Sequence, residues 1–356
     1  MKNDTRCAVI RCRVAAPQTD IASVIIKHIR KQPQLGFSAW ASLAFCADIP
    51  AVYHLVPRFL GGSAAERLFV MSDLGGSRTL EDVLRGTDRR AAQRALTNLA
   101  QTMAQLHAAT VDMADHFEHH RLVLPFSSGL GRHAEAQAWL NRSTEITAWF
   151  AALNRAVPTG FTACLARIAD TYRNPGPFLC FSHGDPAPTN NHIAADGRVR
   201  LLDFEYGAFR HALYDLTAWN VLCPLPRSCV RHMNNTYRRI LAQAIPVAAD
   251  DAQYALNWAC LCAYRALAML TWIKPDILQE NQPWADDRWT SRQAVLAAVI
   301  RLQEAAANLP ALAPAYEAAL LLREALTERW SEYAQTDAVI PPWRAFADEM
   351  PRDAAD

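Results

Sequence analysis

The sequence of 356 residues has little glycine: there are 13, and none precedes Gly36. Proteins average about 7% glycine, so this chain holds roughly half of the usual share. A glycine-rich loop within the first 35 residues is therefore excluded. Net charge is also missing, because 36 Lys and Arg balance 35 Asp and Glu to leave +1. A field this weak favours neither nucleic acid nor an anionic membrane, and we expect neither as a partner.

Disulfides and membrane spans have no support in the sequence. The nine cysteines are an odd number, and no apolar run follows the charged amino terminus, so we expect reduced thiols in the cytoplasm. The longest apolar stretch, 254–273, contains Asn257 and Arg265 and falls short of an uninterrupted span of about 20 residues. Apolar residues, in contrast, make up 51% of the chain, enough for two domains or one two-lobed unit.

The first 75 residues have the pattern of a small sheet with one helix. Alternating or β-branched runs predict strands, and a helical spacing of apolar residues predicts a helix over 37–46. The predicted strands are 7–14, 22–27, 53–60 and 68–72. Gly75 and Gly76 follow, where the pattern changes, and we place a lobe boundary there.

The remainder is mainly helical. Thr79 and Asp82 have the spacing of a capping box, and a longer helix is expected to begin near Asp88. Further helices are expected around 133–152, 161–172, 214–222, 231–244, 252–272, 291–309 and 315–333. The segment 334–356 contains two adjacent prolines and several acidic residues, and we expect a loosely ordered tail.

One segment interrupts the helical pattern and carries chemistry. Asp196-Gly197, between two apolar strands, predicts a two-residue hairpin turn in which Asn190 faces Asp203. Side chains opposite each other in an antiparallel pair have Cβ atoms about 5 Å apart. An amide oxygen and a carboxylate at the open end of a hairpin can share one cation, so we expect Mg²⁺ at Asn190 and Asp203.

A third polar residue, Asp185, precedes Asn190 by five positions in a loop stiffened by two prolines. It can lie beside the metal without binding it, which suits a carboxylate that orients an acceptor hydroxyl and accepts its proton. Each of these residues alone is explained by a turn or a helix cap. Together, His-x-Asp-x-x-x-x-Asn followed by an apolar strand and Asp-Phe is the order of a kinase catalytic loop and metal loop.

These motifs resemble the aminoglycoside phosphotransferase and choline kinase-like family. The resemblance rests on Ser182-His183-Gly184-Asp185 with Asn190, and on 201–205, where Glu205 follows Asp203-Phe204. It also takes in Leu106-His107, 70–75 and Tyr214-Asp215-Leu216, and it covers roughly residues 7–270. It implies an α+β, two-lobed protein kinase-like fold: a reduced nucleotide-binding sheet lobe over 1–75, and a helical lobe over 76–333 with the catalytic hairpin and the acceptor site.

The resemblance also implies an activity and roles. The activity is transfer of the γ-phosphate of ATP or GTP to a hydroxyl of a small acceptor, with Mg²⁺. Asp185 would be the base, Asn190 and Asp203 the magnesium ligands, and His183 and Asp215 supports of the catalytic loop. Glu205 would contact a second metal. In the nucleotide lobe, Lys27 fits the strand lysine that binds phosphates, although an ordinary strand lysine fits equally well, and Asp73 would lie by the nucleotide, where the lobes connect.

Two parts of a kinase nucleotide lobe are missing. There is no glycine-rich hairpin, and the residues before Cys7 are too few to build another strand and loop. There is also no glutamate between Lys27 and Glu66 to pair with the lysine, and Asp48 is a poor substitute. Either the chain starts downstream of the family's first strand, or the apparatus has decayed and the protein is a pseudokinase-like binding module.

The sequence does not identify the acceptor, and it also permits a third class of function. Two tryptophans and two aspartates in 284–289 could flank a cationic acceptor, or could form an ordinary loop with two anchoring rings. The same polar residues also permit a metal-dependent hydrolase, with a transition metal bound to His183, Asp185, Asp203 and either His192 or His211.

Overall fold

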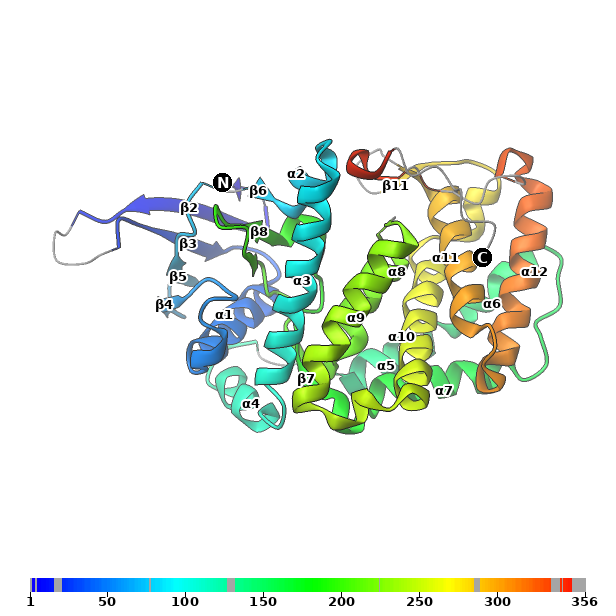
Figure 1. Ribbon diagram of the computed structural model, residues 1–356, viewed down its shortest axis with the longest axis horizontal. Helices are drawn as coiled ribbons and strands as arrows, with labels where there is room; N and C mark the ends of the chain where they lie inside the picture. Colours follow the sequence, from blue (N-terminus) through cyan, green and yellow to red (C-terminus); the bar gives the residue numbers. More distant parts are fainter. Residues whose placement is uncertain are drawn as a thin grey trace. The chain divides into compact units, whose positions relative to one another are not determined.

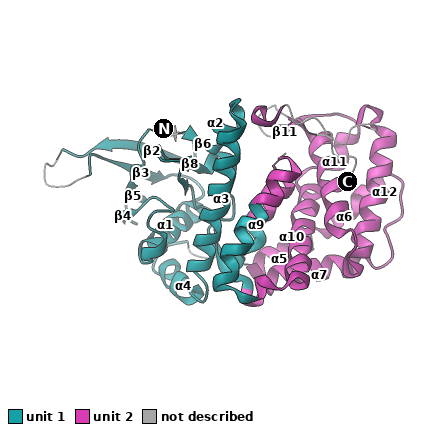
Figure 2. Cartoon of the chain, in the orientation of Figure 1, with its two compact units in different colours: residues 1–131, 178–215, 233–246 teal, residues 132–177, 216–232, 247–356 magenta. Residues whose placement is uncertain are grey.

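The computed structural model describes residues 2–3, 5–15, 21–76, 78–126, 132–223, 225–284, 289–333, 340 and 342–347. The chain forms two compact units, drawn in different colours in Figure 2. Unit 1 consists of 1–131, 178–215 and 233–246, and unit 2 consists of 132–177, 216–232 and 247–356. Both strands and helices contribute, so the predicted α+β class is confirmed.

Unit 1 begins with a five-stranded antiparallel sheet in the order β1-β2-β3-β5-β4 (Figure 1). Its strands are β1 (Lys2–Asn3), β2 (Cys7–Arg13), β3 (Ser23–Ile29), β4 (Phe59–Ser63) and β5 (Leu68–Ser72). The central strand β3 pairs on both edges, which places Lys27 opposite Val9 and Phe69. Pairing on two sides specifies the register, and therefore the face on which Lys27 projects.

The beginning of this sheet differs from the sequence-based expectation. A two-residue strand, β1, precedes β2 and pairs with it through Lys2–Val9 and Asn3–Ala8. The expectation that no further strand fits before Cys7 is therefore wrong. The residues between the two strands include no glycine, so the connection lacks the bare backbone amides that a glycine-rich phosphate loop provides.

The strand expected over 53–60 is also wrong for most of its length. A 3-10 helix, η1 (Pro50–Val52), and a turn come first, and β4 begins only at Phe59. Pro50 and Pro57 flank this region, and proline cannot donate to a strand ladder. Leu55 and Val56 are buried as loop residues, which explains why the segment is apolar without being a strand.

Helix α1 (Pro33–Ala47) packs closely against the sheet. A Cβ atom added at Gly36 would lie 2.6 Å from side-chain atoms of Ile29, so only glycine permits this approach. The helix contains no acidic residue, as the sequence indicates, and Asp48 stands at its C-cap. No carboxylate of α1 is therefore available to pair with Lys27.

Three helices follow in unit 1. The capping box predicted at Thr79 and Asp82 is present at the start of α2 (Leu80–Arg85). Helix α3 (Arg89–Ala109) begins where predicted, and the Asp88 side chain caps it. Helix α3 runs along the catalytic hairpin (Figure 1): Asn98 donates to the Gly197 carbonyl at 2.8 Å. The third helix is α4 (Ala114–Leu122).

The catalytic hairpin consists of β8 (Asn191–Ile193) and β9 (Val199–Leu201), and its register differs by one residue from the prediction. Asn191 pairs with Leu201, and the Ala194 N–H donates to the Arg198 carbonyl at 2.9 Å. The loop therefore has three residues, with Gly197 at φ 82°, instead of two. Consequently Asn190 lies opposite Leu202, whose N–H donates to the Asn190 carbonyl at 2.8 Å, and not opposite Asp203.

The other strands of unit 1 frame this hairpin. β6 (Arg78–Thr79) extends it to a three-stranded sheet in the order β6-β8-β9, and β7 (Leu179–Ser182) pairs with β10 (Ala208–His211). The 3-10 helix η3 (Pro188–Asn190) joins the catalytic loop to β8. Helices α8 (Leu213–Val221) and α9 (Arg227–Ala244) each contribute one end to unit 1.

In its described residues, unit 2 consists of helices and one short hairpin. Its remaining helices are α5 (Arg132–Asn141), α6 (Ser143–Ala152), α7 (Phe161–Arg173), α10 (Asp251–Trp272), α11 (Ser291–Ala306) and α12 (Ala313–Arg329). The helix expected over 133–152 is thus two helices, with a break at Arg142. The strands β11 (Pro283–Trp284) and β12 (Trp289–Thr290) pair with each other.

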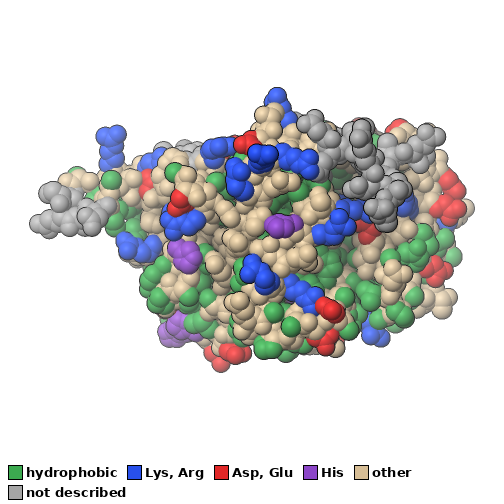
Figure 3. All heavy atoms as spheres, in the orientation of Figure 1, with side chains coloured by type: hydrophobic (Ala, Val, Ile, Leu, Met, Phe, Trp, Pro, Cys, Tyr) green, Lys and Arg blue, Asp and Glu red, His purple; other side chains and the backbone are tan. Residues whose placement is uncertain are grey.

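Two expectations in unit 2 fall partly outside the described residues. The aspartates proposed to flank a cationic acceptor lie in 285–288, for which no structure is described. The described part of the tail, 342–347, buries Trp343 and Phe346. On the face seen in Figure 3, charges of both signs are scattered among hydrophobic side chains. Among the described residues, no helix has both the length and the apolar character to cross a bilayer.

Candidate active site

The site is organised by a buried carboxylate, Asp215, at the start of α8. It is fully buried and accepts the Ser182 hydroxyl at 2.9 Å, the His183 N–H at 2.7 Å and the Gly184 N–H at 2.9 Å. These donors are consecutive residues, the last of β7 and the first two of the loop that follows it. One side chain therefore holds the backbone of the catalytic loop directly before Asp185.

A second layer supports Asp215. His107, at the end of α3, places Nε2 3.1 Å from Asp215 and Nδ1 2.6 Å from the Tyr237 hydroxyl, which donates to the Ala212 carbonyl at 2.7 Å. His107 thus connects the Asp215 carboxylate to Tyr237 on α9, and through Tyr237 to the backbone at Ala212.

The pKa of Asp215 reflects this network. Burial alone would raise it, but the hydrogen bond from His107, the electrostatic interaction with that residue and the amide of Gly184 outweigh burial and hold the pKa well below its usual range. The carboxylate is therefore ionised whenever the protein is folded near neutral pH. An ionised acceptor of this kind makes stronger hydrogen bonds than a neutral one, which stiffens the loop.

His183 is fully buried, and both ring nitrogens are engaged. Nδ1 accepts the Asp185 N–H at 3.2 Å, and Nε2 lies 2.6 Å from the Leu202 carbonyl, to which it must donate. This pattern is that of the neutral ring with its proton on Nε2. The geometry supports the expectation that His183 holds the catalytic loop against the Asp203 segment and does not itself transfer a proton.

Asp185 and Asn190 are in direct contact. Asn190 Nδ2 donates to the Asp185 carbonyl at 2.9 Å and to its carboxylate Oδ2 at 3.3 Å. Asp185 is exposed, so its carboxylate is accessible to a hydroxyl group from solvent. The amide group of Asn190 thereby has a fixed orientation, with Nδ2 toward Asp185.

Lys27 and Asp203 form an ion pair, with Nζ 2.5 Å from Oδ1. The lysine is buried on the central strand β3, and Asp203 follows β9 with a left-handed backbone at φ 60°. Such a backbone is uncommon outside glycine and occurs often at functional positions. Lys27 is thus directed at the predicted metal loop, as a phosphate-binding lysine requires, although no helix carboxylate accompanies it.

The residues at the predicted magnesium site fit such an ion chemically. An amide oxygen from Asn190 and a carboxylate from Asp203 are oxygen ligands of the kind that Mg²⁺ selects. Leu202, which directly precedes Asp203, donates its N–H to the Asn190 carbonyl, so the two candidate ligands lie on adjoining segments in spite of the shifted register. Glu205, two residues further on, forms an ion pair with Arg6 at 3.3 Å. Within the described residues, therefore, Glu205 already neutralises a cation of the chain itself.

Asp73, which was predicted to lie by the nucleotide, has side-chain partners that the sequence did not indicate. Its carboxylate accepts Ser23 Oγ at 2.6 Å and the Gly75 N–H at 2.9 Å, and it pairs with Arg11 Nε at 2.7 Å. Burial opposes ionisation, but these hydrogen bonds and the Arg11 charge together lower the pKa of Asp73. The side chain of Asp73 is therefore engaged by groups of the chain itself.

Four participants in this site were not identified from the sequence: Tyr237, Arg11, Ser23 and Arg6. Each contacts a residue that is distant in the sequence, so no local spacing could have indicated it.

His192 is buried, and neither of its ring nitrogens has a hydrogen-bond partner. Burial, together with the Arg200 charge, lowers the pKa of His192, so the ring is neutral at pH 7.

The ligand set of the hydrolase hypothesis does not come together. Among the described residues, the one group of three or more His, Cys, Asp or Glu side chains able to share an ion lies elsewhere, at the end of α1. His183 is committed to Leu202 and Asp185. His211 is fully buried, stacks on Phe178 and accepts the Leu213 N–H at 3.2 Å. The geometry thus gives no support to a transition-metal hydrolase at this site.

Gly184 is required by the close approach of the catalytic loop to the metal loop. It has φ 86°, and an added Cβ would lie 2.4 Å from the Tyr206 carbonyl oxygen. Gly197 shares the left-handed backbone, at φ 82°, but its added Cβ would meet only Asn98, at 3.9 Å.

Gly197→Ala should therefore lower the free energy of unfolding by about 1–2 kcal/mol, for the backbone alone. Gly184→Ala should lower it clearly more, because the added Cβ also meets Tyr206. Urea unfolding of both variants measures the difference, and equal losses would show that the Tyr206 contact is unimportant.

A model of the phosphotransferase enzyme family matches residues 27–228 of the chain. The match contains Lys27, the hinge with Asp73, the catalytic loop, the metal loop and Asp215. A search of curated protein sequences found no match.

Among solved structures, a macrolide 2'-phosphotransferase from Brachybacterium faecium is 16% identical with a TM-score of 0.46, covering 82% of this chain and 88% of its own. An ethanolamine kinase from Plasmodium vivax is 11% identical with a TM-score of 0.45, covering 87% and 81%. A choline kinase from Streptococcus pneumoniae is 12% identical with a TM-score of 0.41, covering 84% and 94%.

Proposed function

Because the chain belongs to the phosphotransferase enzyme family, we propose that it is a small-molecule kinase that moves the γ-phosphate of ATP or GTP to a hydroxyl of a small acceptor. The observation that carries this proposal is the chain of contacts through the site. Lys27 pairs with Asp203, the residue before Asp203 donates its N–H to the Asn190 carbonyl, and the Asn190 amide donates to Asp185. Phosphoryl transfer needs a phosphate-binding cation, metal ligands and an acceptor-orienting carboxylate side by side.

In this proposal each residue has one task. Asp185 aligns the acceptor hydroxyl and accepts its proton, while Asn190 and Asp203 hold Mg²⁺, with Glu205 as a further contact. The bound ion would bridge and neutralise the phosphates. Lys27 contacts the phosphates when a nucleotide is bound, and its ion pair with Asp203 is then weakened. His183 and Asp215 keep the loop in position, so that Asp185 needs little reorganisation during the reaction.

A second candidate function has its own observation. The strand pair β1–β2 has no glycine in its connection, and α1 has no carboxylate for Lys27. A pseudokinase-like module that binds a ligand without transferring phosphate would keep the loop network while losing these two parts. The two proposals differ in turnover, so an acceptor panel separates them.

Nucleotide binding is tested by thermal unfolding with and without Mg-ATP and Mg-GTP. A ligand at 100 times its dissociation constant stabilises the folded state by about 2.7 kcal/mol. We expect a magnesium-dependent rise in Tm for the wild type, its loss in Asp203→Ala, and its retention in Asp196→Ala, which alters an exposed carboxylate at the tip of the same hairpin. The ligand-induced shift is compared within each variant, because Asp203→Ala also leaves buried Lys27 without its ion pair.

A nucleotide shift alone does not establish transfer. The wild type is therefore incubated with Mg-ATP or Mg-GTP and a panel of hydroxyl acceptors, including choline, ethanolamine, aminoglycosides and macrolides, and the phosphorylated product is detected by mass. Product formed in proportion to enzyme supports the kinase. A clear nucleotide shift without product from any acceptor would favour the binding module, and no shift with either nucleotide would contradict the proposed site.

A further inference from the structure

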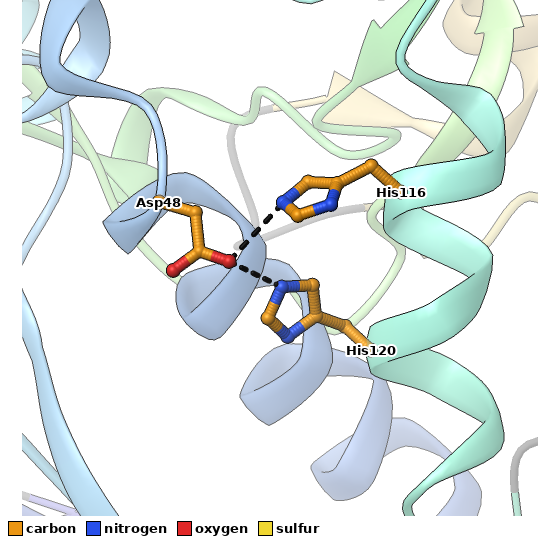
Figure 4. A group of neighbouring side chains, drawn as sticks. All are labelled: Asp48, His116 and His120. Atoms are coloured by element: carbon orange, nitrogen blue, oxygen red, sulfur yellow. Dashed lines mark hydrogen bonds and ion pairs between the residues drawn. The ribbon is translucent and has the colours of Figure 1, made fainter.

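A cluster of three ligand-type side chains lies in unit 1 apart from the kinase motifs (Figure 4). Asp48 stands at the C-cap of α1, and His116 and His120 project toward it from α4. The two histidines are four residues apart, which places them on the same face of the helix. Their Nε2 atoms lie 3.1 Å and 2.8 Å from the same carboxylate oxygen, Asp48 Oδ2.

The geometry is close to that of a metal site. One ligand atom from each residue lies within 4.8 Å of the other two. A tetrahedral Zn²⁺ site has bonds of about 2.0–2.2 Å to imidazole nitrogen and carboxylate oxygen, which places neighbouring ligand atoms about 3.3 Å apart. Small side-chain movements would therefore admit an ion between the three atoms, without any change in the backbone.

The surroundings fix the two rings and leave the ion a route to reach them. The ring of Phe45, which is fully buried, lies 5.6 Å from His116 and 6.3 Å from His120 between ring centres. The side chains of His116 and Asp48 are 41% and 49% exposed. Histidine side chains reach the surface over α4 (Figure 3). The C-terminal end of α1 also carries the negative end of a helix dipole, which favours a cation beside Asp48.

We propose that Asp48, His116 and His120 form a three-ligand site for a borderline divalent transition metal, with Zn²⁺ as the best fit and water in the fourth position. Two imidazoles and one carboxylate suit Zn²⁺, whereas Mg²⁺ prefers oxygen ligands and octahedral geometry. This site is separate from the one proposed at Asn190 and Asp203, and it does not depend on the kinase activity.

The ion would join two helices of unit 1. Asp48 ends α1, which packs on the sheet carrying Lys27 through Gly36 and Ile29. Helix α1 also contacts the metal loop, since Ser42 Oγ, which donates to the Ser38 carbonyl at 2.7 Å, lies 3.3 Å from the Phe204 carbonyl oxygen. A metal bound between α1 and α4 should therefore stabilise the helix that adjoins both Lys27 and the Asp203 segment. The expected consequence is a higher Tm in Zn²⁺, without any requirement for nucleotide.

The test is direct binding of Zn²⁺ to the full chain, without a polyhistidine tag, after treatment with a chelator and dialysis. Competition against a chromophoric zinc indicator measures stoichiometry and affinity. We expect one saturable site in the wild type, and binding weakened at least tenfold in His120→Ala and in Asp48→Asn. The matched control is His119→Ala, which removes an exposed histidine of the same helix outside the cluster and should bind as the wild type does.

Two further readouts keep the assignment falsifiable. Co²⁺ in place of Zn²⁺ should give visible absorption bands of a low-symmetry four-coordinate site in the wild type and not in His120→Ala. Circular dichroism of each variant establishes that it is folded, as expected for partly exposed positions. Absence of saturable Zn²⁺ binding in the wild type would overturn the proposal. So would equal binding by His120→Ala, or displacement of Zn²⁺ by equimolar Mg²⁺.

Discussion

Asp185→Asn should lose most phosphoryl transfer while remaining folded and able to bind Mg-nucleotide. The side chain is exposed, and its Oδ2 receives the Asn190 amide at 3.3 Å. Asparagine keeps a carbonyl oxygen for that hydrogen bond, so the loop should stay in place. It cannot accept the proton of the acceptor hydroxyl, and a positioned general base contributes about 10²–10⁴-fold to a reaction rate. We therefore expect kcat to fall by about 10²–10⁴-fold.

The measurement is steady-state transfer to whichever acceptor the panel identifies, together with the nucleotide-induced shift in Tm. Asp196→Asn is the control, because this exposed carboxylate lies on the same hairpin and binds Arg198 locally. It should leave both quantities unchanged. A kcat for Asp185→Asn within a few-fold of the wild type would show that another group serves as the base.

Asp215→Asn should strongly destabilise unit 1. The carboxylate is fully buried, accepts three donors of the catalytic loop and faces His107. An asparagine NH₂ group would face hydrogen-bond donors of the catalytic loop and would leave His107 without its carboxylate partner. Each buried donor left unsatisfied costs about 1–3 kcal/mol. Urea unfolding at pH 7 measures this loss, and Asp170→Asn, an exposed carboxylate on α7, should change the free energy of unfolding little.

Acid adds an independent check on Asp215. Its pKa is lowered in the folded protein, whereas an unfolded chain protonates aspartate near pH 4. The stabilisation is therefore complete above about pH 5 and is lost progressively as the pH falls below about 4. Between pH 6 and pH 3 the wild type should lose more of its free energy of unfolding than Asp215→Asn. Parallel pH dependences in the two proteins would contradict the assigned role of this carboxylate.

The sequence was most informative where local chemistry decides structure. The capping box at Thr79, the helix start near Asp88 and the strand predicted over 7–14 depend on residues a few positions apart, and the structure has all three. The motif spacing around Asp185 and Asn190 was sufficient to predict the family, and the family model confirms it. The absence of an early glycine and of a carboxylate in α1 could also be deduced from composition alone.

Predictions were wrong where one residue or one distant contact decides the outcome. The register of β8 and β9 shifted by one because the chain adopts a three-residue loop ending in left-handed Gly197 instead of the two-residue turn that Asp-Gly also permits. The apolar segment before β4 was mistaken for a strand because burial, and not strand pairing, explains its composition. Neither choice leaves a signal in the local pattern.

By itself, the sequence determined the α+β class, the phosphotransferase family and the identity of the polar residues that carry the proposed chemistry, because these depend on residue types and short spacings. The tertiary structure alone decided which of these residues meet. It paired Lys27 with Asp203 across 176 positions, enclosed Asp215 with His107 and Tyr237, and brought Asp48 to the histidines of α4. Contacts between distant segments are set by packing of whole elements, and no local pattern encodes them.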